Sequence, residues 1–234
     1  MKFTAEKSQI VDSLQNAAAV AERRQTIPIL ANLRLKASSG KLEVTATDLE
    51  IQIKNYSDLL SIEEEGETTV SARKMSELCR SLPDAENVDF LLKDGKLTVS
   101  SKNFHGDFAT ISADDFPELE VNEEQKSTEI LSGVLKRILT KTSFSMASQD
   151  VRYYLNGLLL ELSEGEIKGV ATDGHRLAVS SSKAEGKGFE MRNILPRKAV
   201  LELAKLLPPE DTPIELLVGP TYIGVKTESL NFSS

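Results

Sequence analysis

One short segment combines side chains that could perform acid–base or metal chemistry. Thr172-Asp173-Gly174-His175-Arg176-Leu177 brings together a carboxylate, an imidazole and a guanidinium, and His175 is one of two histidines in the chain. Such a set could serve general acid–base catalysis or hold a metal ion. No second His or Cys lies at ligand spacing, and no nucleophile motif accompanies the segment. The simpler alternative is that Asp173-Gly174 only forms a turn.

The composition is that of an ordinary globular protein. The chain has 234 residues, 40% hydrophobic and 27% charged, a length that favours two domains. Cys79 is the only cysteine, which excludes an internal disulfide and favours a reducing compartment. No apolar stretch follows Met1-Lys2-Phe3, and no 18-residue apolar run exists. We therefore expect a cytoplasmic protein without a membrane segment.

The sequence contains one pattern twice, at an offset of 124 or 125 residues. A period this long indicates duplicated domains, because solenoid repeats run only about 20–50 residues. The paired landmarks are Asn32 with Asn156, Ala46-Thr47-Asp48 with Ala171-Thr172-Asp173, Arg73-Lys74 with Arg197-Lys198, and Leu82-Pro83 with Leu207-Pro208.

Each copy predicts the same order of elements. Apolar residues at helical spacing predict helices over 6–24, 70–82, 131–147 and 196–207. The second helix of each copy stops at Leu-Pro, as a helix does before proline. Alternating apolar residues predict half-buried strands around these helices. The fold class is therefore α+β: tandem domains, each with two helices packed on an antiparallel sheet.

The expected domains are residues 1–124 and 125–234, joined by an acidic linker from Glu118 to Lys126. The first copy continues through a strand ending at Ile111 to the Phe116-Pro117 turn. The second copy stops at Ser234 without that last strand or that turn. We therefore expect the second domain to be incomplete at its C-terminal end and the chain to be a fragment.

Charge is segregated along the chain. The four predicted helices carry 0, +2, +3 and +2, although the whole chain carries −8. For any one helix, Lys and Arg on a solvated face are the simple explanation. Three positive helices in an acidic protein instead favour a basic surface for a polyanion. Without a recognition helix, zinc site or aromatic series, binding would be through phosphates and independent of base sequence.

The two copies differ at two segments that the fold does not demand. Where the second copy has Asp173-Gly174-His175-Arg176, the first has Asp48-Leu49-Glu50. Where the second has Arg152-Tyr153-Tyr154-Leu155, the first has Pro28-Ile29-Leu30-Ala31. A fold requirement would appear in both copies, so these differences predict functions particular to the second domain. Aromatic and Arg residues of this kind are commonly contact residues.

At these residues the chain resembles the bacterial DNA polymerase III β subunit, the sliding clamp, across its whole length. The resemblance is carried by Gln149-Asp150-Val151-Arg152-Tyr153-Tyr154-Leu155-Asn156-Gly157, Ala171 to Ala178, and Pro196-Arg197-Lys198. It implies a three-domain protomer, here without its third domain. Two protomers would close head to tail around sequence-independent duplex DNA, and DNA polymerases and a clamp loader would bind through short peptides. The implied protein is a non-catalytic processivity factor without cofactors or metals.

The resemblance also implies roles for particular residues. We expect the 1–234 chain alone to be a monomer. The implied DNA-facing residues are Arg24, Arg73, Gln149, Tyr153, Tyr154, Arg197 and Lys198; the implied partner-peptide pocket is Leu155, Thr172, Gly174, His175, Arg176 and Leu177; the implied ring interface is Lys74 and Phe108.

Two other classes of protein remain as alternatives. An enzyme centred on His175 and Asp173 predicts that His175→Ala abolishes an activity while partner binding stays intact. A structural scaffold that does not bind DNA predicts no salt-dependent effect of Arg and Lys changes on the helices.

Overall fold

The computed structural model describes residues 1–21, 27–83, 86–119, 125–163, 165–184, 190–208, 211–220 and 222–234. The chain divides into two compact units, which we describe separately. Unit 1 comprises Met1–Leu119 with Glu228–Leu230, and unit 2 comprises Glu120–Thr227 with Asn231–Ser234. The expected domain boundary at 124/125 adjoins residues 120–124, which lie outside the described part of the chain.

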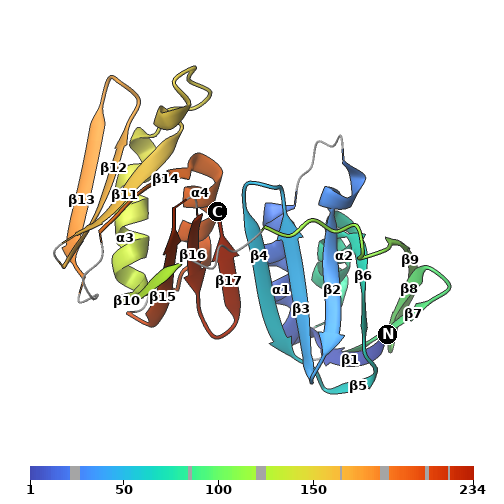
Figure 1. Cartoon of the computed structure of the whole chain (residues 1–234). Helices are drawn as coiled ribbons and strands as arrows, with labels where there is room; N and C mark the ends of the chain where they lie inside the picture. Colours follow the sequence, from blue (N-terminus) through green and yellow to red (C-terminus); the bar gives the residue numbers. More distant parts are fainter. Residues whose placement is uncertain are drawn as a thin grey trace. The chain divides into compact units, whose positions relative to one another are not determined.

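Unit 1 is an α+β domain with its helices on one face of an antiparallel sheet (Figure 1). Helix α1 packs on β3, β4 and α2, and α2 also packs on β2 and β6. The strands lie in the order β4-β3-β2-β6-β9-β8-β7-β1-β5. The elements are β1 Lys2–Glu6, α1 Lys7–Val20, η1 Pro28–Ala31, β2 Asn32–Ser38, β3 Lys41–Thr47, β4 Gln52–Asp58, β5 Ser61–Glu64, β6 Gly66–Ser71, α2 Ala72–Ser81, β7 Asn87–Lys93, β8 Lys96–Ser101 and β9 Phe104–Ile111.

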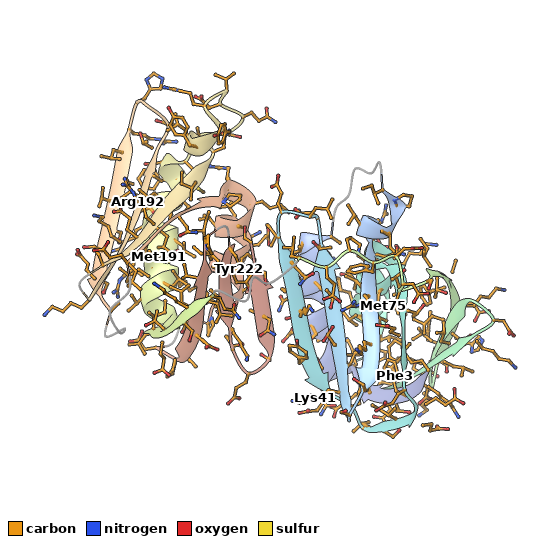
Figure 2. All side chains as sticks on the ribbon, viewed as in Figure 1. Phe3, Lys41, Met75, Met191, Arg192 and Tyr222 are labelled. Carbon is orange, nitrogen blue, oxygen red and sulfur yellow. The ribbon has the colours of Figure 1, made fainter. Side chains whose placement is uncertain are left out.

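The core of unit 1 lies between this sheet and the two helices. Met75 of α2 and Phe3 of β1, both labelled in Figure 2, are buried. The ring of Phe3 stacks on that of Phe90, with centroids 4.6 Å apart. Burying such aromatic and aliphatic side chains is the main favourable term in folding.

Unit 2 repeats the same order of elements, but its strands form two four-stranded groups. One sheet has the order β13-β12-β11-β14 and the other β10-β15-β16-β17. Helix α3 packs on β12, β13 and α4, and α4 packs on β11 and β14. The elements are β10 Lys126–Leu131, α3 Ser132–Thr142, η2 Ser143–Ser145, η3 Tyr153–Leu155, β11 Gly157–Ser163, β12 Glu166–Thr172, β13 Leu177–Lys183, β14 Met191–Pro196, α4 Arg197–Leu206, β15 Pro213–Gly219, β16 Tyr222–Lys226 and β17 Leu230–Ser233.

Helix α3 and strand β12 come unusually close at Gly169. A Cβ atom on this residue would lie 2.5 Å from Cγ2 of Ile138 on α3. Only glycine leaves room for the Ile138 side chain at that distance. The first copy has Val44 on the corresponding strand β3, so the two units pack their first helix differently on the same strand.

The duplication predicted from the sequence is confirmed by the order of elements. Strands β2, β3, β4 and β6 correspond to β11, β12, β13 and β14, and helices α1 and α2 correspond to α3 and α4. One expectation is wrong: the second copy does have its last strand, because Leu230–Ser233 forms β17 and pairs antiparallel with β16.

In both units a lysine on the first helix donates a hydrogen bond to the carbonyl at the C-terminal end of the second helix. Nζ of Lys7 in α1 donates to the carbonyl of Leu82, the residue that follows α2. Nζ of Lys136 in α3 donates to the carbonyl of Leu207 at 2.6 Å, just after α4. A cation at a helix C-terminus satisfies a carbonyl without an intrahelical partner and opposes the helix dipole.

Among the described residues, no helix is both long and apolar enough to cross a membrane.

Candidate functional site

The chemistry-bearing segment of unit 2 forms a compact turn between β12 and β13, which we call the Thr–Asp turn (residues 172–176). The Thr172 hydroxyl donates to the carbonyl of Arg176 at 2.7 Å and accepts from the Gly174 amide at 3.1 Å. Oδ1 of Asp173 accepts from the amides of His175 and Arg176, both at 3.0 Å. The two polar side chains therefore hold the turn closed.

Unit 1 makes the same turn at residues 47–51. The Thr47 hydroxyl donates to the carbonyl of Ile51 at 2.8 Å and accepts from the Leu49 amide at 3.1 Å. Oδ1 of Asp48 accepts from the amides of Glu50 and Ile51 at 3.0 and 2.8 Å. Thr and Asp thus make the same bonds in both turns, whereas Gly174, His175 and Arg176 are particular to unit 2.

The carboxylate of Asp173 is fully engaged in this turn. Besides the two amides on Oδ1, its Oδ2 accepts from Nε of Arg176 at 2.9 Å. The hydrogen bonds from the His175 and Arg176 amides lower the pKa of Asp173, since they favour its charged form. A carboxylate held in this way acts as a turn cap, which is the structural alternative to a catalytic role.

A second charged pair fixes the neighbouring loop against the turn. Asp150 accepts from Nε and Nη2 of Arg152, both at 3.0 Å, and from the Arg152 amide at 2.8 Å. These bonds lower the pKa of Asp150 to about 2, with a smaller contribution from the charge of His175. On the other side, Arg152 lies over Gly174, where a Cβ would be 3.3 Å from its Nη2. The loop and the Thr–Asp turn therefore form one contact surface.

Replacing Gly174 by alanine is expected to disturb this surface. Gly174 has φ +88, where an L side chain is strained, and the new methyl group would press on Arg152. We expect the free energy of unfolding to fall by about 1 kcal/mol. Chemical denaturation measures that loss, and Gly95→Ala is the matched control, because Gly95 has φ +73 with open space around it. An equal loss at both glycines would mean that the Arg152 contact contributes nothing.

The expected pocket residues lie together around the turn. Leu177 begins β13 and is 65% exposed, whereas Leu155 at the end of η3 is buried. The guanidinium of Arg176 lies over the ring of Phe144, with its carbon 5.5 Å from the ring centroid. Phe144 is itself exposed. Phe144 and Asp150 were not among the residues expected at the site, and Arg152 was expected only as a contact residue without a stated role; their roles depend on contacts that only the fold creates.

The expected DNA-facing residues of unit 2 differ in their exposure and in their hydrogen bonds. Gln149 has φ +60 in the loop before η3, and Tyr153 and Tyr154 are 83% and 52% exposed with their rings edge to face at 6.1 Å. Arg197 instead donates from Nη1 to the carbonyl of Met146 at 3.0 Å, which anchors the segment leading into this loop. Lys198 is half-buried on the first turn of α4.

In unit 1 the expected residues lie on α2 and β9. Arg73 is exposed and pairs with Glu77 at 2.8 Å, and Lys74 beside it is also exposed. Phe108 lies half-buried on β9, opposite Leu97. Arg24 lies outside the described residues. Helices α1 and α2 also leave between them a cavity of about 570 Å³, whose lining includes Gln15, Ala18, Arg73, Ser76 and Arg80.

The architecture is that of a DNA clamp: one α+β unit, present twice, with paired helices on antiparallel sheets. The family model described as the N-terminal domain of the DNA polymerase III beta subunit matches residues 1–120, and the model of its central domain matches residues 129–234. The chain belongs to the DNA polymerase III beta subunit family.

Curated relatives and solved structures agree with this assignment. The chain is 39% identical to the beta sliding clamp of Pseudomonas aeruginosa and 37% to that of Escherichia coli, covering 100% of this chain and 64% of each relative. The crystal structure of the P. aeruginosa DNA polymerase III subunit beta matches with a TM-score of 0.95 at 39% identity, and a Bacillus subtilis sliding clamp with 0.94 at 27%. Each match covers 100% of this chain and 64% of that structure.

Proposed function

We propose that this chain is part of a ring-forming processivity factor that tethers a replicative DNA polymerase, and other replication and repair proteins, to duplex DNA in the cytoplasm. The observation that carries the proposal is the match of both units to sliding clamps over the full chain. The role is topological, because a closed ring cannot leave DNA sideways. It needs no catalytic group, in keeping with Asp173 acting as a turn cap.

The proposed DNA contacts are few and directed to phosphates. Exposed Tyr153 and Tyr154, with Gln149 in the same loop, support contact by that loop. Arg73 and Lys198 place positive charge on the first turns of α2 and α4. Arg197 is engaged with the carbonyl of Met146, so we assign it a positioning role. Arg24 remains a candidate on its sequence position. A ring that slides needs loose, salt-dependent contacts of this kind.

The proposed partner site is the surface around the Thr–Asp turn of unit 2. A P. aeruginosa sliding clamp has been solved bound to griselimycin, and it matches this chain with a TM-score of 0.96 at 40% identity. That clamp therefore binds a ligand, and exposed Leu177 beside His175 and Arg176 offers a comparable apolar surface with polar neighbours. We propose that polymerases and the clamp loader dock peptides here, and that Lys74 and Phe108 belong to the ring interface.

The topological role is tested by loading the full-length natural protein onto nicked circular DNA with its clamp loader and ATP. We expect it to co-elute with the circle in gel filtration and to elute as free protein after a single cut linearises the DNA. The 1–234 chain serves as the control: it should elute at the mass of one 25.7 kDa chain, without DNA. Equal retention of the full-length protein on cut and uncut DNA would contradict the proposal.

A further inference from the structure

Each polar atom of Asn156 is hydrogen-bonded within unit 2. Its Oδ1 accepts from the Asp150 amide and its Nδ2 donates to the Asp150 carbonyl, both at 2.9 Å. We call these two bonds the asparagine clasp. An amide side chain carries an acceptor and two donors, so it can hold both backbone groups of one residue. The Asn156 amide donates to the carbonyl of Tyr153 at 3.0 Å, and the Asn156 carbonyl accepts from the Arg197 amide at 2.9 Å. Asn156 therefore joins the loop that carries Asp150 to the first residue of α4.

The residue that follows Asn156 fixes it to the sheet. Gly157 begins β11, and a Cβ atom there would collide with the carbonyl oxygen of Leu195 on β14. Only glycine allows the two backbones to approach so closely. Because β11 is held against β14 and the Asn156 carbonyl is bonded to α4, the asparagine side chain extends from a fixed part of the domain.

The loop side of the asparagine clasp leads to the Thr–Asp turn. The clasp holds the backbone of Asp150, and the Asp150 carboxylate accepts from Nε and Nη2 of Arg152, both at 3.0 Å. Nη2 of Arg152 in turn lies 3.3 Å from the position that a Cβ of Gly174 would take. In Figure 1 the loop and the turn lie at the same end of unit 2. A continuous series of contacts therefore runs from the Asn156 amide to the turn.

The corresponding asparagine of unit 1 has a different partner. Asn32 follows the short helix η1 as Asn156 follows η3, and Nδ2 of Asn32 donates to the Thr69 hydroxyl at 3.0 Å. Thr69 lies on β6, which pairs with β2, so this bond joins two neighbouring strands of the sheet. The counterpart of Asp150 by the repeat offset is Thr26, which lies outside the described residues. The bond of Asn32 thus serves the sheet, whereas the bonds of Asn156 serve a loop beside the Thr–Asp turn.

We propose that Asn156 is a positioning residue of the partner-peptide surface, and that it acts by fixing Asp150 and, through Asp150, the side chain of Arg152 beside Gly174. The inference rests on the proposed function, because it takes the surface around the Thr–Asp turn as the place where peptides dock. Asn156 itself does not touch the peptide. Its amide sets the position of the Arg152 guanidinium before the peptide arrives, so that less ordering is needed on binding.

Asn156→Asp in the full-length natural protein tests the proposal, because it keeps the shape of the side chain and replaces the Nδ2 donor by an oxygen. That oxygen would face the Asp150 carbonyl, so the asparagine clasp loses one bond and gains a repulsion. We expect the Kd of a labelled peptide of the Gln-Leu-x-Leu-Phe type, measured by fluorescence anisotropy, to rise at least about fivefold. Asn193→Asp on β14 is the matched control, because Nδ2 of Asn193 also donates to a backbone carbonyl, that of Gly219 at 3.4 Å. Its Kd should stay within about twofold of wild type.

A double-mutant cycle separates positioning from support of the fold. Arg152→Ala is expected to raise the same Kd at least about fivefold, and adding Asn156→Asp to it should raise the Kd by less than about twofold more, because Asn156 acts through Arg152. If the two losses multiply, Asn156 acts independently of Arg152 and the proposal is overturned. A lower free energy of unfolding with wild-type affinity in Asn156→Asp would also overturn it, because Asn156 would then only support the fold.

The peptide assay distinguishes failure of this inference from failure of the proposed function. If the wild-type full-length protein does not bind the peptide, the proposed partner site is wrong and the inference falls with it. If wild type binds and Asn156→Asp binds equally well, the partner site stands and only the role of Asn156 is overturned. Asn156→Ala removes both bonds of the asparagine clasp without adding a charge. It replaces Asn156→Asp in the same cycle if that variant does not unfold cooperatively in urea.

Discussion

Leu177→Asp is expected to weaken the binding of a clamp-binding peptide of the Gln-Leu-x-Leu-Phe type by at least about tenfold, and to leave the fold intact. Covering one leucine side chain is worth about 1.5–3 kcal/mol, and about 1.4 kcal/mol corresponds to a factor of ten in Kd. The aspartate would also place a charge where an apolar anchor must be desolvated. Because Leu177 is 65% exposed in this chain, its replacement removes little packing.

Fluorescence anisotropy with a labelled peptide measures the effect, first on the 1–234 chain and then on the full-length protein. Leu60→Asp is the matched control, because Leu60 is an exposed leucine of unit 1. His175→Ala and Leu155→Ala test the rest of the surface around the Thr–Asp turn. If full-length proteins carrying Leu177→Asp or Leu60→Asp bind the labelled peptide equally well, the partner site lies elsewhere. An activity lost in His175→Ala with peptide binding unchanged would instead favour the enzyme alternative.

Glu118→Gln is expected to lower the free energy of unfolding of unit 1 by about 1.5 kcal/mol, the lower end of the range of about 1.5–3 kcal/mol for hydrogen bonds to charged groups. Glu118 is bonded by Arg34 and Lys54, and the Arg34 side chain is only 10% exposed. Removing the carboxylate charge leaves that guanidinium with Glu43 at 3.1 Å and Glu67 at 4.0 Å as its ion-pair partners. The upper end of the range is not expected, because Glu118 is partly exposed and solvent screens the pair.

The same pair predicts how stability depends on pH. The hydrogen bond from Lys54, with that from Arg34, lowers the pKa of Glu118 from 4.5 to about 2. A depressed folded-state pKa means that the contribution is fully present above about pH 4.5 and is lost as the pH falls toward 2. Urea unfolding at several pH values should therefore show the difference between wild type and Glu118→Gln shrinking over that window. Glu50→Gln, at an exposed turn position, should show no such convergence.

The elements of the fold were accessible from the sequence because local signals agreed with the repeat. The helices predicted over 70–82 and 196–207 are α2 (Ala72–Ser81) and α4 (Arg197–Leu206), each ended by the Leu-Pro pair. Strand β17 was missed because Leu230–Ser233 is only four residues long, too short for alternation to be distinctive. Residues 116–118 were interpreted as turn and linker, because the contact between Glu118 and Arg34 joins residues 84 positions apart.

Only part of the candidate site could be predicted from the sequence. Comparing the two copies singled out Gly174, His175 and Arg176, and the structure places them on the turn that Thr172 and Asp173 close. The packing of Arg152 on Gly174 could not be predicted, because it depends on how the loop before η3 folds back. The engagement of Arg197 with a backbone carbonyl is likewise invisible in a sequence that shows only a basic residue at the start of a helix.

The Thr–Asp turn of unit 2 and its counterpart at residues 47–51 show how a duplicated domain can change its specificity without losing the hydrogen bonds that hold its turn. The Thr hydroxyl and the Asp side chain close both turns, and in unit 2 the Arg176 side chain adds a contact to Asp173. Leu49 at φ +77 and Gly174 at φ +88 occupy the same place in the two copies. The residues after the aspartate therefore differ between the copies, while the conformation of the turn stays the same. Substitutions at these positions can turn one copy into a recognition surface, while the Thr and Asp residues keep the fold of both copies.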